Sequence, residues 1–492
     1  MNKQGRQIAI IGAGFSGSLL AIHLLRQSQP EDQIYLIERG AEFGRGLAYS
    51  TGNPGHLLNV RAGNMSAFSD RPDDFLDWLR ALPDEERRGI STTADHLTFA
   101  PRALYGSYIQ HILAQEIWGT GRTSRLGLVA DEAVALHPAG RGYQLEVGSG
   151  RLYEVDAVAL ATGNFPHGGS TRGYVANPWG PDVVTLLDQD ATVLLVGTGL
   201  TMVDVVVSLL DRRHRGQILA ISRRGLLPRT HAAVRPWPRF LFPMTAPRSI
   251  GALLRAVRDE IRRVEAKGGD WRAVIDSLRL DTQDLWAGLP LEEKRRFLRH
   301  LRAWWDVHRH RMAPAVAARV MAALEGGQLT IRRARLGRVT PASAATSDTE
   351  LQAEILPVTG GRPTTLTVAR VINCSGPVSD ISRVEEPLMH ALLDAGQVRP
   401  DPLDLGLDIT DRGAVIDRSG WPSQTLFAVG PITKGAFWET TAVPDIRRQC
   451  ERLAGHILRS LISPEKPELT LSNRVGGWMK PGSVDRMRLA CR

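Results

Sequence analysis

Two segments of this chain each combine a buried apolar strand, a glycine-rich turn and the start of a helix. The first is IAIIGAGFSGSLLAIHLL, residues 8–25, and the second is VLLVGTGLTMVDVVV, residues 193–207. In such a turn the glycines let backbone N–H groups approach a pyrophosphate at the N-terminus of the helix. We therefore expect two parallel α/β units, each with a dinucleotide bound at its first turn.

The first turn carries the complete GxGxxG pattern. Gly12 permits the tight turn, Gly14 permits close approach of the pyrophosphate, and Gly17 permits close packing of the helix on the strand. The next strand, QIYLIERG, ends in Glu38, about twenty residues downstream, where a carboxylate can bind ribose hydroxyls. This order of elements predicts a site for FAD or NAD, in preference to a packing turn without a ligand.

The second turn differs from the first at the positions that select the coenzyme. Gly197 and Gly199 are retained, but Met202 replaces the third glycine, so the helix is expected slightly farther from the strand. The next strand, ILAISRRG, ends in Arg223 and Arg224 instead of an acid. Because arginines can bind the extra 2′-phosphate of NADP, these residues favour NADPH over NADH, with ordinary surface charge as the alternative.

The segments after the two turns repeat one order of elements. The first copy continues through the hairpin YQLEVGSGRLYEV to the strand AVALATG, and the second through LQAEILPVTGGRPTTLTVA to the strand RVINCSG. The unit thus recurs at 8–163 and 193–376. We predict an α/β fold with two Rossmann-like dinucleotide-binding domains and a helical insertion. The expected domains are residues 1–185, residues 186–376 with an insert at about 231–325, and residues 377–492, which return to the first domain and end in a tail.

Three segments lie outside the repeat. Residues 44–120 begin with a Gly- and Asn-rich stretch, expected to be a loop around a flavin ring. The return segment ends a strand at Gly430, and we expect Thr440 or Thr441 to cap the next helix, whose N-terminus would stabilise a reduced flavin. In the insert, apolar residues of PLEEKRRFLRHLRAWWDVHRHRMAP share a helical face. Its Trp residues are expected in the core, or lining a pocket for an aromatic substrate.

Composition excludes several classes of function. The 492-residue chain has a formal net charge of +9, but its arginines between 212 and 335 alternate with acids and apolar residues. We read this as solvated helix surface and expect no nucleic-acid partner. Three cysteines without a CxxC spacing argue against disulfides, dithiol redox chemistry and Cys-rich metal sites. His308 and His310 fall on different helical faces, so no metal is expected. No apolar run is long enough to span a membrane, so we expect a cytoplasmic protein. The sequence does not determine its oligomeric state.

The quoted motifs resemble the two-dinucleotide-binding flavoproteins, which include flavin-containing monooxygenases and pyridine-nucleotide disulfide reductases. GAGFSG, LATG and GTG are shared broadly in that superfamily. The combination of LLNVRAGNMSAF, GTGLTMVD, WWDVHRHRMAP and GPITKGAFWETTAVPDIRRQ is similar to the YdhS-like FAD/NAD(P)-binding oxidoreductases, over nearly the whole chain. The resemblance implies FAD at the first turn and a pyridine nucleotide at the second. One departure is Gly430-Pro431, where many relatives have Gly-Asp, so another group must make the aspartate's flavin contact.

From this resemblance we expect a single-component monooxygenase that hydroxylates a small aromatic or N-heterocyclic substrate with O2, through a flavin C4a-(hydro)peroxide. The alternatives are an NAD(P)H:acceptor reductase, and a flavin-bound sensor or scaffold. Candidate ring-shaping or catalytic residues are Asn59, Asn64, Met65, Trp438 and Glu439, and Arg309 and Arg311 could hold an anionic substrate. The expected cofactor contacts are Gly12, Gly14, Ser16, Gly17, Glu38, Arg39, Asn59, Val134, Thr162, Gly163, Gly197, Gly199, Thr201, Arg223, Arg224, Gly376, Gly430 and Thr441.

Overall fold

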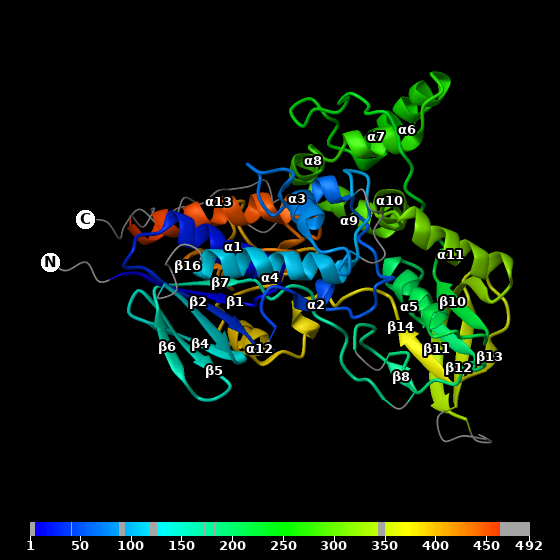
Figure 1. Ribbon diagram of the computed structural model, residues 1–492, viewed down its shortest axis with the longest axis horizontal. Helices are drawn as coiled ribbons and strands as arrows, with labels where there is room; N and C mark the ends of the chain where they lie inside the picture. Colours follow the sequence, from blue (N-terminus) through cyan, green and yellow to red (C-terminus); the bar gives the residue numbers. More distant parts are fainter. Residues whose placement is uncertain are drawn as a thin grey trace, which may run out of the picture.

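The computed structural model describes residues 5–40, 42–87, 94–118, 125–171, 173–180, 183–342 and 350–462. It contains two large sheets, each covered by helices, one small antiparallel sheet, and a group of helices above the second sheet (Figure 1). Cys491 and the rest of the expected C-terminal tail lie outside the described residues. None of the helices in the described ranges has the length and apolarity that a bilayer crossing requires.

The first sheet has β1 at its centre, with the order β15-β16-β7-β1-β2-β3. β1 runs parallel to β2 and β7, and β16 runs parallel to β7, so the chain returns to the first sheet after the second unit. Only β15, at the edge, pairs antiparallel. The strands are β1 (Gln7–Ile11), β2 (Gln33–Glu38), β3 (Leu126–Ala130), β7 (Ala157–Leu160), β15 (Ala414–Ile416) and β16 (Pro422–Ala428).

The two faces of the first sheet carry different layers. Ile8 and Ile10 point to one face, where the helices α1, α4 and α13 lie (Figure 1), while Ala9 and Ile11 point to the other. That second face packs on the small sheet β4-β5-β6 and on α12. The bounds are α1 (Phe15–Gln27), α2 (Gly46–Tyr49), α3 (Asp74–Ala81), α4 (Arg102–Trp118), α12 (Pro387–Asp394), α13 (Val443–Ile462), β4 (Ala133–Ala139), β5 (Gly142–Val147) and β6 (Leu152–Val155).

The second sheet repeats this plan, which confirms the predicted fold class. Its order is β13-β12-β11-β10-β9-β14-β8, with β9 parallel to both β10 and β14. The predicted hairpin is β12-β13, which extends the same sheet instead of forming a separate one. β8 precedes residue 185 yet pairs with β14. The bounds are β8 (Tyr174–Val175), β9 (Val193–Val196), α5 (Leu200–Asp211), β10 (Ile218–Ser222), α11 (Pro314–Glu325), β11 (Leu329–Pro341), β12 (Leu351–Pro357), β13 (Thr364–Val368) and β14 (Arg370–Asn373).

The insert between β10 and α11 is helical, as predicted, and has an apolar core of its own. The apolar face around Phe297 and Trp305 was expected in one helical stretch, but the chain forms two helices that meet at Leu301. Its helices are α6 (Ile250–Ala266), α7 (Trp271–Ser277), α8 (Thr282–Gly288), α9 (Leu291–His300) and α10 (Arg302–Arg309).

Candidate functional site

The first glycine turn has the geometry of a dinucleotide cradle. Gly12 has φ +100°, and its N–H donates to Ile37 O at 2.8 Å, which fixes the turn against β2. A Cβ at Gly12 would lie 2.4 Å from Ala161 O, and one at Gly17 would lie 1.8 Å from Gly12 O. Both positions therefore exclude any side chain. Gly14 precedes α1, whose N-terminus faces the open end of the turn.

The second turn has the same geometry at its first glycine. Gly197 has φ +113°, its N–H donates to Ile221 O at 2.7 Å, and a Cβ there would lie 2.3 Å from Cys374 O. Gly199 has open space around it, so a phosphate can approach the N-terminus of α5. Met202, in place of the third glycine, is fully buried in the core beneath the helix.

The predicted ribose-binding residues lie at the carboxyl end of β2. Glu38 Oε2 accepts the N–H of Ala13 in the first turn at 2.8 Å, so its carboxylate already lies beside the cradle. Arg39 points elsewhere, because its guanidinium donates to Glu386 Oε2 at 2.7 Å. Val134 is half-buried in β4, which follows the neighbouring strand β3.

Further candidate flavin contacts gather at the same edge of the sheet. Thr162 and Gly163 lie just after the end of β7, and the buried Thr162 hydroxyl has no hydrogen-bond partner among the described residues. Gly430 follows β16 with φ +80°, and a Cβ there would lie 2.4 Å from Ser16 Oγ. The cradle, the acid and the orphaned hydroxyl fit the pyrophosphate and ribose of FAD. Next to Pro431, which stands where many relatives have an aspartate, the Gly430 N–H donates to Gln449 Oε1 at 2.9 Å.

The two arginines after β10 have different surroundings. Arg223 is exposed at the end of the strand. Arg224 is half-buried, and its guanidinium donates to the backbone carbonyls of Arg299 and His300 at 3.3 and 3.2 Å, at the end of α9. Arg224 would therefore have to give up these protein contacts to bind a coenzyme phosphate, and the role of Arg223 at a 2′-phosphate stays a prediction. Thr201 in α5 is half-buried, and Gly376 follows β14 with φ +99°.

The loop expected around the flavin ring joins the first unit to the second. Asn59 O accepts a hydrogen bond from His231 Nε2 at 3.0 Å. Burial, with the cations Arg311 and Arg61 nearby, lowers the pKa of His231 to about 3. Asn64 is exposed, whereas Met65 is 2% exposed and packs in the core of the first unit. The structure thus gives Met65 a packing position, and Asn59 a position at the junction of the two units.

Four residues that the sequence analysis did not single out join the first unit to α5. His56 Nε2 lies 2.9 Å from Asp204 O and 2.8 Å from Ser208 Oγ, both in α5. Arg102 Nη1, in α4, lies 2.8 Å from Asp204 Oδ2. The sequence did contain a sign of this contact: Asp204 is the one acid in the apolar run LTMVDVVVSLL, where a buried carboxylate needs a partner. Burial raises the pKa of the Asp204 carboxyl, and Arg102 opposes that effect.

The candidates before α13 contact the helical insert. Trp438 is 3% exposed and stacks on Trp286, with ring centroids 4.8 Å apart. The Glu439 carboxylate accepts from Trp305 Nε1 at 2.9 Å and from Arg309 Nε at 3.1 Å. The expected N-cap is wrong by at least one residue, because α13 begins at Val443 and the Thr440 hydroxyl donates to Phe437 O. Thr441 is exposed and lies outside the helix.

Both arginines expected to hold an anionic substrate have acidic partners within the chain. Arg309 pairs with Glu439, and Arg311 Nη2 pairs with Asp276 of α7. Arg311 is nevertheless 2% exposed with Nε and Nη1 unpartnered. Arg309 is therefore a structural cation, and Arg311 retains donors that the described residues leave unused.

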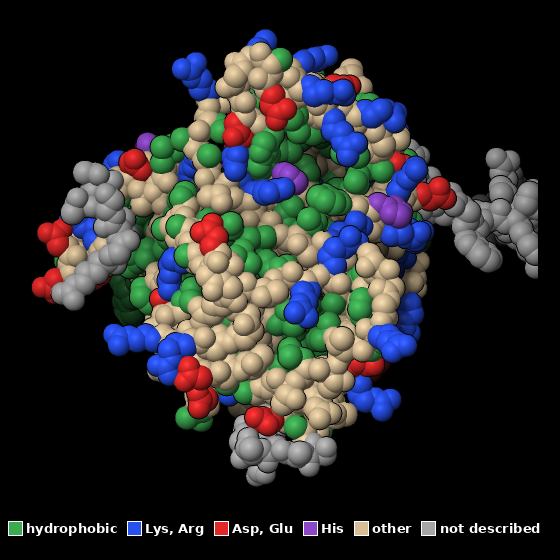
Figure 2. Space-filling model, turned by 90° about the vertical axis from the view of Figure 1, so that its right-hand side faces the viewer, with side chains coloured by type: hydrophobic (Ala, Val, Ile, Leu, Met, Phe, Trp, Pro, Cys, Tyr) green, Lys and Arg blue, Asp and Glu red, His purple; other side chains and the backbone are tan. Residues whose placement is uncertain are grey.

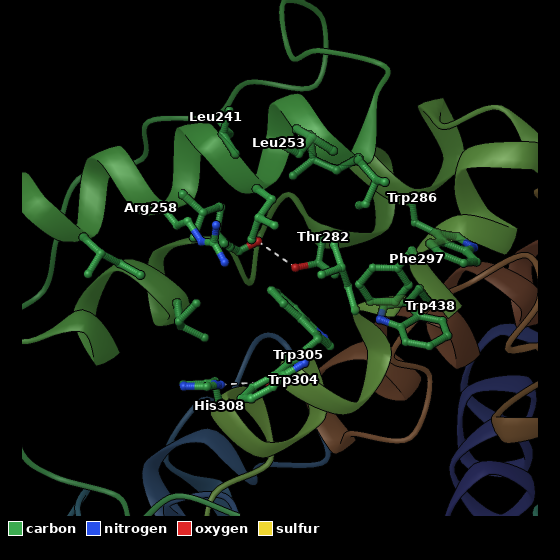
Figure 3. Close-up of a pocket in the computed structure, with 18 of the residues that line it drawn as sticks. Leu241, Leu253, Arg258, Thr282, Trp286, Phe297, Trp304, Trp305, His308 and Trp438 are labelled. Atoms are coloured by element: carbon green, nitrogen blue, oxygen red, sulfur yellow. Dashed lines mark hydrogen bonds between the residues drawn. The ribbon is translucent and has the colours of Figure 1, made fainter. Parts of the chain in front are cut away.

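A cavity of about 550 Å³ lies within the insert, closed on one side by Trp438. Its lining is mostly apolar and includes Trp271, Trp286, Trp304 and Trp305 (Figure 3). Figure 2 shows hydrophobic side chains at the bottom of a hollow in the upper part of the molecule, with Lys and Arg around it. Trp286, Trp271 and Trp305 belong to or pack on the apolar core of the insert, and together with Trp304, which is 44% exposed, they line the cavity. That the cavity takes an aromatic substrate stays a prediction.

Other redox and metal chemistry finds little support in the described residues. Cys374 and Cys450 are both buried and unbridged, in different units. Burial raises the pKa of both thiols. No cluster of three His, Cys, Asp or Glu side chains suited to a metal occurs in the ranges described.

Comparison with known proteins agrees with this geometry. Residues 9–165 match the FAD-NAD(P)-binding family. No curated protein matches the chain by sequence.

Solved structures match nearly the whole chain at low identity. Ornithine hydroxylase from Pseudomonas aeruginosa, in its reduced form, has a TM-score of 0.62 and 13% identity, covering 93% of this chain and all (100%) of that one. Ornithine N-hydroxylase from Kutzneria sp. 744 has a TM-score of 0.61 and 14% identity, covering 92% and 99%. L-lysine 6-monooxygenase from Pseudomonas syringae has a TM-score of 0.58 and 14% identity, covering 92% and 99%. The chain therefore shares its fold with these hydroxylases over nearly its whole length, and its FAD-NAD(P)-binding match lies in the first unit.

Proposed function

We propose that this protein is an FAD-dependent monooxygenase that consumes NADPH and hydroxylates a small molecule. The observation that carries the proposal is the pair of equivalent glycine turns, at Gly12 and Gly197, each built against a neighbouring strand by the same backbone hydrogen bond. A chain with two such turns can bind a pyridine nucleotide as electron donor and a flavin at the same time. The fold shared with ornithine and lysine hydroxylases supports the choice of oxygenation.

The first unit is proposed to hold FAD. The backbone of Gly12 to Gly14 and the N-terminus of α1 would bind the pyrophosphate, and Glu38 would bind the ribose. The unpartnered hydroxyl of Thr162 would gain a hydrogen bond at the carboxyl end of β7. When bound, FAD supplies hydride acceptance and oxygen activation, so no protein nucleophile is needed.

The second unit is proposed to hold NADPH and to orient it. Gly197, Gly199 and the N-terminus of α5 would bind the pyrophosphate, with Arg223 on the 2′-phosphate. The contacts of His56 and Arg102 with α5 fix that helix against the first unit. These contacts would hold the two glycine turns at a fixed distance and orientation, because hydride transfer requires the two cofactors to be close and well oriented.

The finer family assignment is also part of the proposal. The motifs LLNVRAGNMSAF and GPITKGAFWETTAVPDIRRQ are similar to the YdhS-like oxidoreductases. In this chain the first motif supplies the junction loop with Asn59, and the second supplies the segment from Gly430 to α13 that contacts the insert. The first motif thus contacts the segment that leads into the insert, and the second contacts the insert itself.

The experiment that tests oxygenation compares electron acceptors. Protein reduced with NADPH is mixed with air-saturated buffer or with dichlorophenolindophenol in the absence of oxygen, and the return of flavin absorbance is followed. A monooxygenase reoxidises with O2 and couples O2 uptake to an oxygenated product when substrate is present. Fast reoxidation by the dye with negligible reaction with O2 would identify an acceptor reductase instead.

A further inference from the structure

The cavity in the helical insert has the size and lining of a small-molecule site. Its volume of about 550 Å³ lies within the ordinary range for such sites, roughly 300–1,000 Å³. Five tryptophans contribute to its wall, from α7, α8, α10 and the segment before α13: Trp271, Trp286, Trp304, Trp305 and Trp438. An apolar wall of this kind gains free energy by burying an apolar ligand.

The arrangement of the rings favours an aromatic ligand. Trp286 stacks on Trp438 at 30° between ring planes, and Phe297 meets the Trp438 ring edge-on, at 89° and 5.3 Å between centroids. Figure 3 shows these rings along one side of the cavity, with Trp304 and Trp305 on another. A flat ring between them can extend the same stacked and edge-to-face contacts.

The charges around the cavity disfavour a cationic ligand. Lys434 Nζ lies 5.0 Å from the Trp438 ring centroid, and Lys294 Nζ lies 5.2 Å from that of Trp286. Neither lysine belongs to the cavity lining, but both lie close behind its tryptophan wall, and their positive charges repel an added ammonium group. Arg258 and His308 line the cavity, whereas Glu265 lies at an exposed position on the same lining.

Two tryptophans of the cavity wall are hydrogen-bonded to the segment that leaves the edge of the first sheet where FAD is proposed. Trp286 Nε1 donates to Gly435 O at 2.9 Å, and Trp305 Nε1 donates to Glu439 Oε1 at the same distance. Gly435 and Glu439 belong to the segment that links Gly430, at the carboxyl end of β16, to α13. Ligands of α/β sheets bind outside the carboxyl ends of the strands, and this segment joins that position to the cavity wall.

We propose that this cavity is the substrate site, and that the substrate is an aromatic molecule without a cationic group. The inference rests on the proposed function and names its substrate class. It separates this protein from the ornithine and lysine hydroxylases that share its fold, because the substrates in their names carry an amino group at the end of a flexible chain.

The test is calorimetric titration of the FAD-loaded protein, without coenzyme, with three naphthalene probes. 1-Naphthol, 1-naphthoate and 1-naphthylmethylamine share a ring and differ in charge. We expect 1-naphthol and 1-naphthoate to bind, and the ammonium probe to bind at least about tenfold more weakly, which corresponds to about 1.4 kcal/mol. Equal or tighter binding of the ammonium probe would overturn the proposal, as would the absence of binding by all three.

Two variants of the cavity lining, Leu254→Trp and Trp304→Ala, and one control variant, Met244→Trp, test whether the probes bind in the cavity. Leu254→Trp, on the lining, fills the space and is expected to reduce affinity for 1-naphthol at least about tenfold. Met244→Trp adds the same side chain at a fully exposed position of the insert and should leave affinity unchanged. Trp304→Ala removes one ring of the cavity wall and is expected to weaken binding. Because Trp304 is 44% exposed, this variant keeps the test available if Leu254→Trp does not fold. Unchanged affinity in both lining variants would place the probe elsewhere.

Failure of this inference is distinguishable from failure of the proposed function. NADPH reduction of the flavin is measured on the same preparation by absorbance, and it needs no naphthalene probe. If the flavin is reduced and the probes fail to bind, the substrate class is wrong and the monooxygenase proposal stands. If the probes bind as expected but NADPH leaves the flavin oxidised, the aromatic site stands and the proposed reaction falls.

Discussion

Arg309 Nη2 and Glu439 Oε2 lie 3.1 Å apart and form an ion pair that is buried on both sides, with 8% and 3% of the two side chains exposed. The pair joins α10 of the insert to the segment just before α13. Glu439 also has φ +69°, a backbone conformation that costs about 1–3 kcal/mol outside glycine and persists only where surrounding contacts hold it. The insert and the first unit are therefore locked together at this residue.

Removing the charge of Glu439 should destabilise the protein strongly. Glu439→Gln keeps the shape but leaves Arg309 buried without its counter-charge, which typically costs about 3–5 kcal/mol. We expect a corresponding fall in the free energy of unfolding by urea denaturation, while Glu265→Gln at an exposed position stays within about 0.5 kcal/mol of the parent. Replacing both partners, Arg309→Leu with Glu439→Leu, should recover part of the loss. Equal stability of Glu439→Gln and the parent would contradict a structural ion pair.

The same pair predicts a dependence of stability on pH. Burial by itself raises the pKa of Glu439, but Arg309 and other nearby cations outweigh it, so the pKa is lowered from 4.5 in the folded state. The stabilising contribution is therefore complete above the unfolded pKa and is lost as the pH falls through the lowered folded pKa. Urea denaturation from pH 7 down to pH 3 should show a smaller acid-dependent loss in Glu439→Gln than in the parent, and parallel curves would refute the assignment.

Substitutions in the two glycine turns should impair different functions, FAD binding at the first turn and reduction by NADPH at the second. Gly12→Ala would push a Cβ to 2.4 Å from Ala161 O, and we expect protein purified with little or no bound FAD. Gly197→Ala would bring a Cβ to 2.3 Å from Cys374 O, so FAD should remain while reduction by NADPH slows by at least about tenfold. Gly288→Ala has open space and serves as the matched control. Loss of FAD in Gly197→Ala with retention in Gly12→Ala would reverse the assignment of the turns.

Most of the fold could be predicted from the sequence, because its determinants are local. The strand at 8–11, the turn at Gly12 and the acid at Glu38 follow one another within forty residues, and the repeat at Gly197 has the same spacing. The alternation in YQLEVGSGRLYEV likewise predicts the hairpin β5-β6.

The candidate site could be predicted only in part, because its remaining contacts join distant segments. Nothing near Trp438 in the sequence indicates that it stacks on Trp286, and the pairing of Glu439 with Arg309 spans 130 residues. Met65 is a sequence candidate for the flavin site because it lies in the Gly- and Asn-rich loop after Gly55, yet its side chain packs inward among core residues. Such contacts depend on how the insert and the units pack together, which local patterns do not encode.

Coenzyme preference should depend on Arg223 far more than on Arg224. Arg223→Ala removes the exposed cation, and we expect KM for NADPH to rise about tenfold or more with KM for NADH unchanged. Arg224→Ala should have a smaller effect, because that guanidinium is bound to the carbonyls of Arg299 and His300. Steady-state NAD(P)H oxidation measures both. A larger change in Arg224→Ala, or equal loss with NADPH and NADH, would count against a 2′-phosphate contact.

The buried cysteines should be unreactive in the folded protein. Cys374 and Cys450 are 3% and 0% exposed, and burial raises the pKa of both thiols, so the thiolate is scarce at pH 8. In a Cys491→Ser background, Ellman's reagent should titrate no thiol in native buffer and both thiols in guanidinium chloride. Rapid reaction of a native thiol, or its appearance only after NADPH is added, would instead favour dithiol chemistry.

The central claim is that two dinucleotide sites operate together, and anaerobic flavin reduction tests it most directly. The absorbance of the purified protein is recorded without oxygen, before and after addition of NADPH, with NADH in a parallel cuvette. The account predicts a bound flavin whose absorbance near 450 nm, the usual flavin band, is bleached by NADPH faster than by NADH. A protein that carries no flavin, or a flavin that neither coenzyme reduces even with an aromatic ligand present, would contradict it.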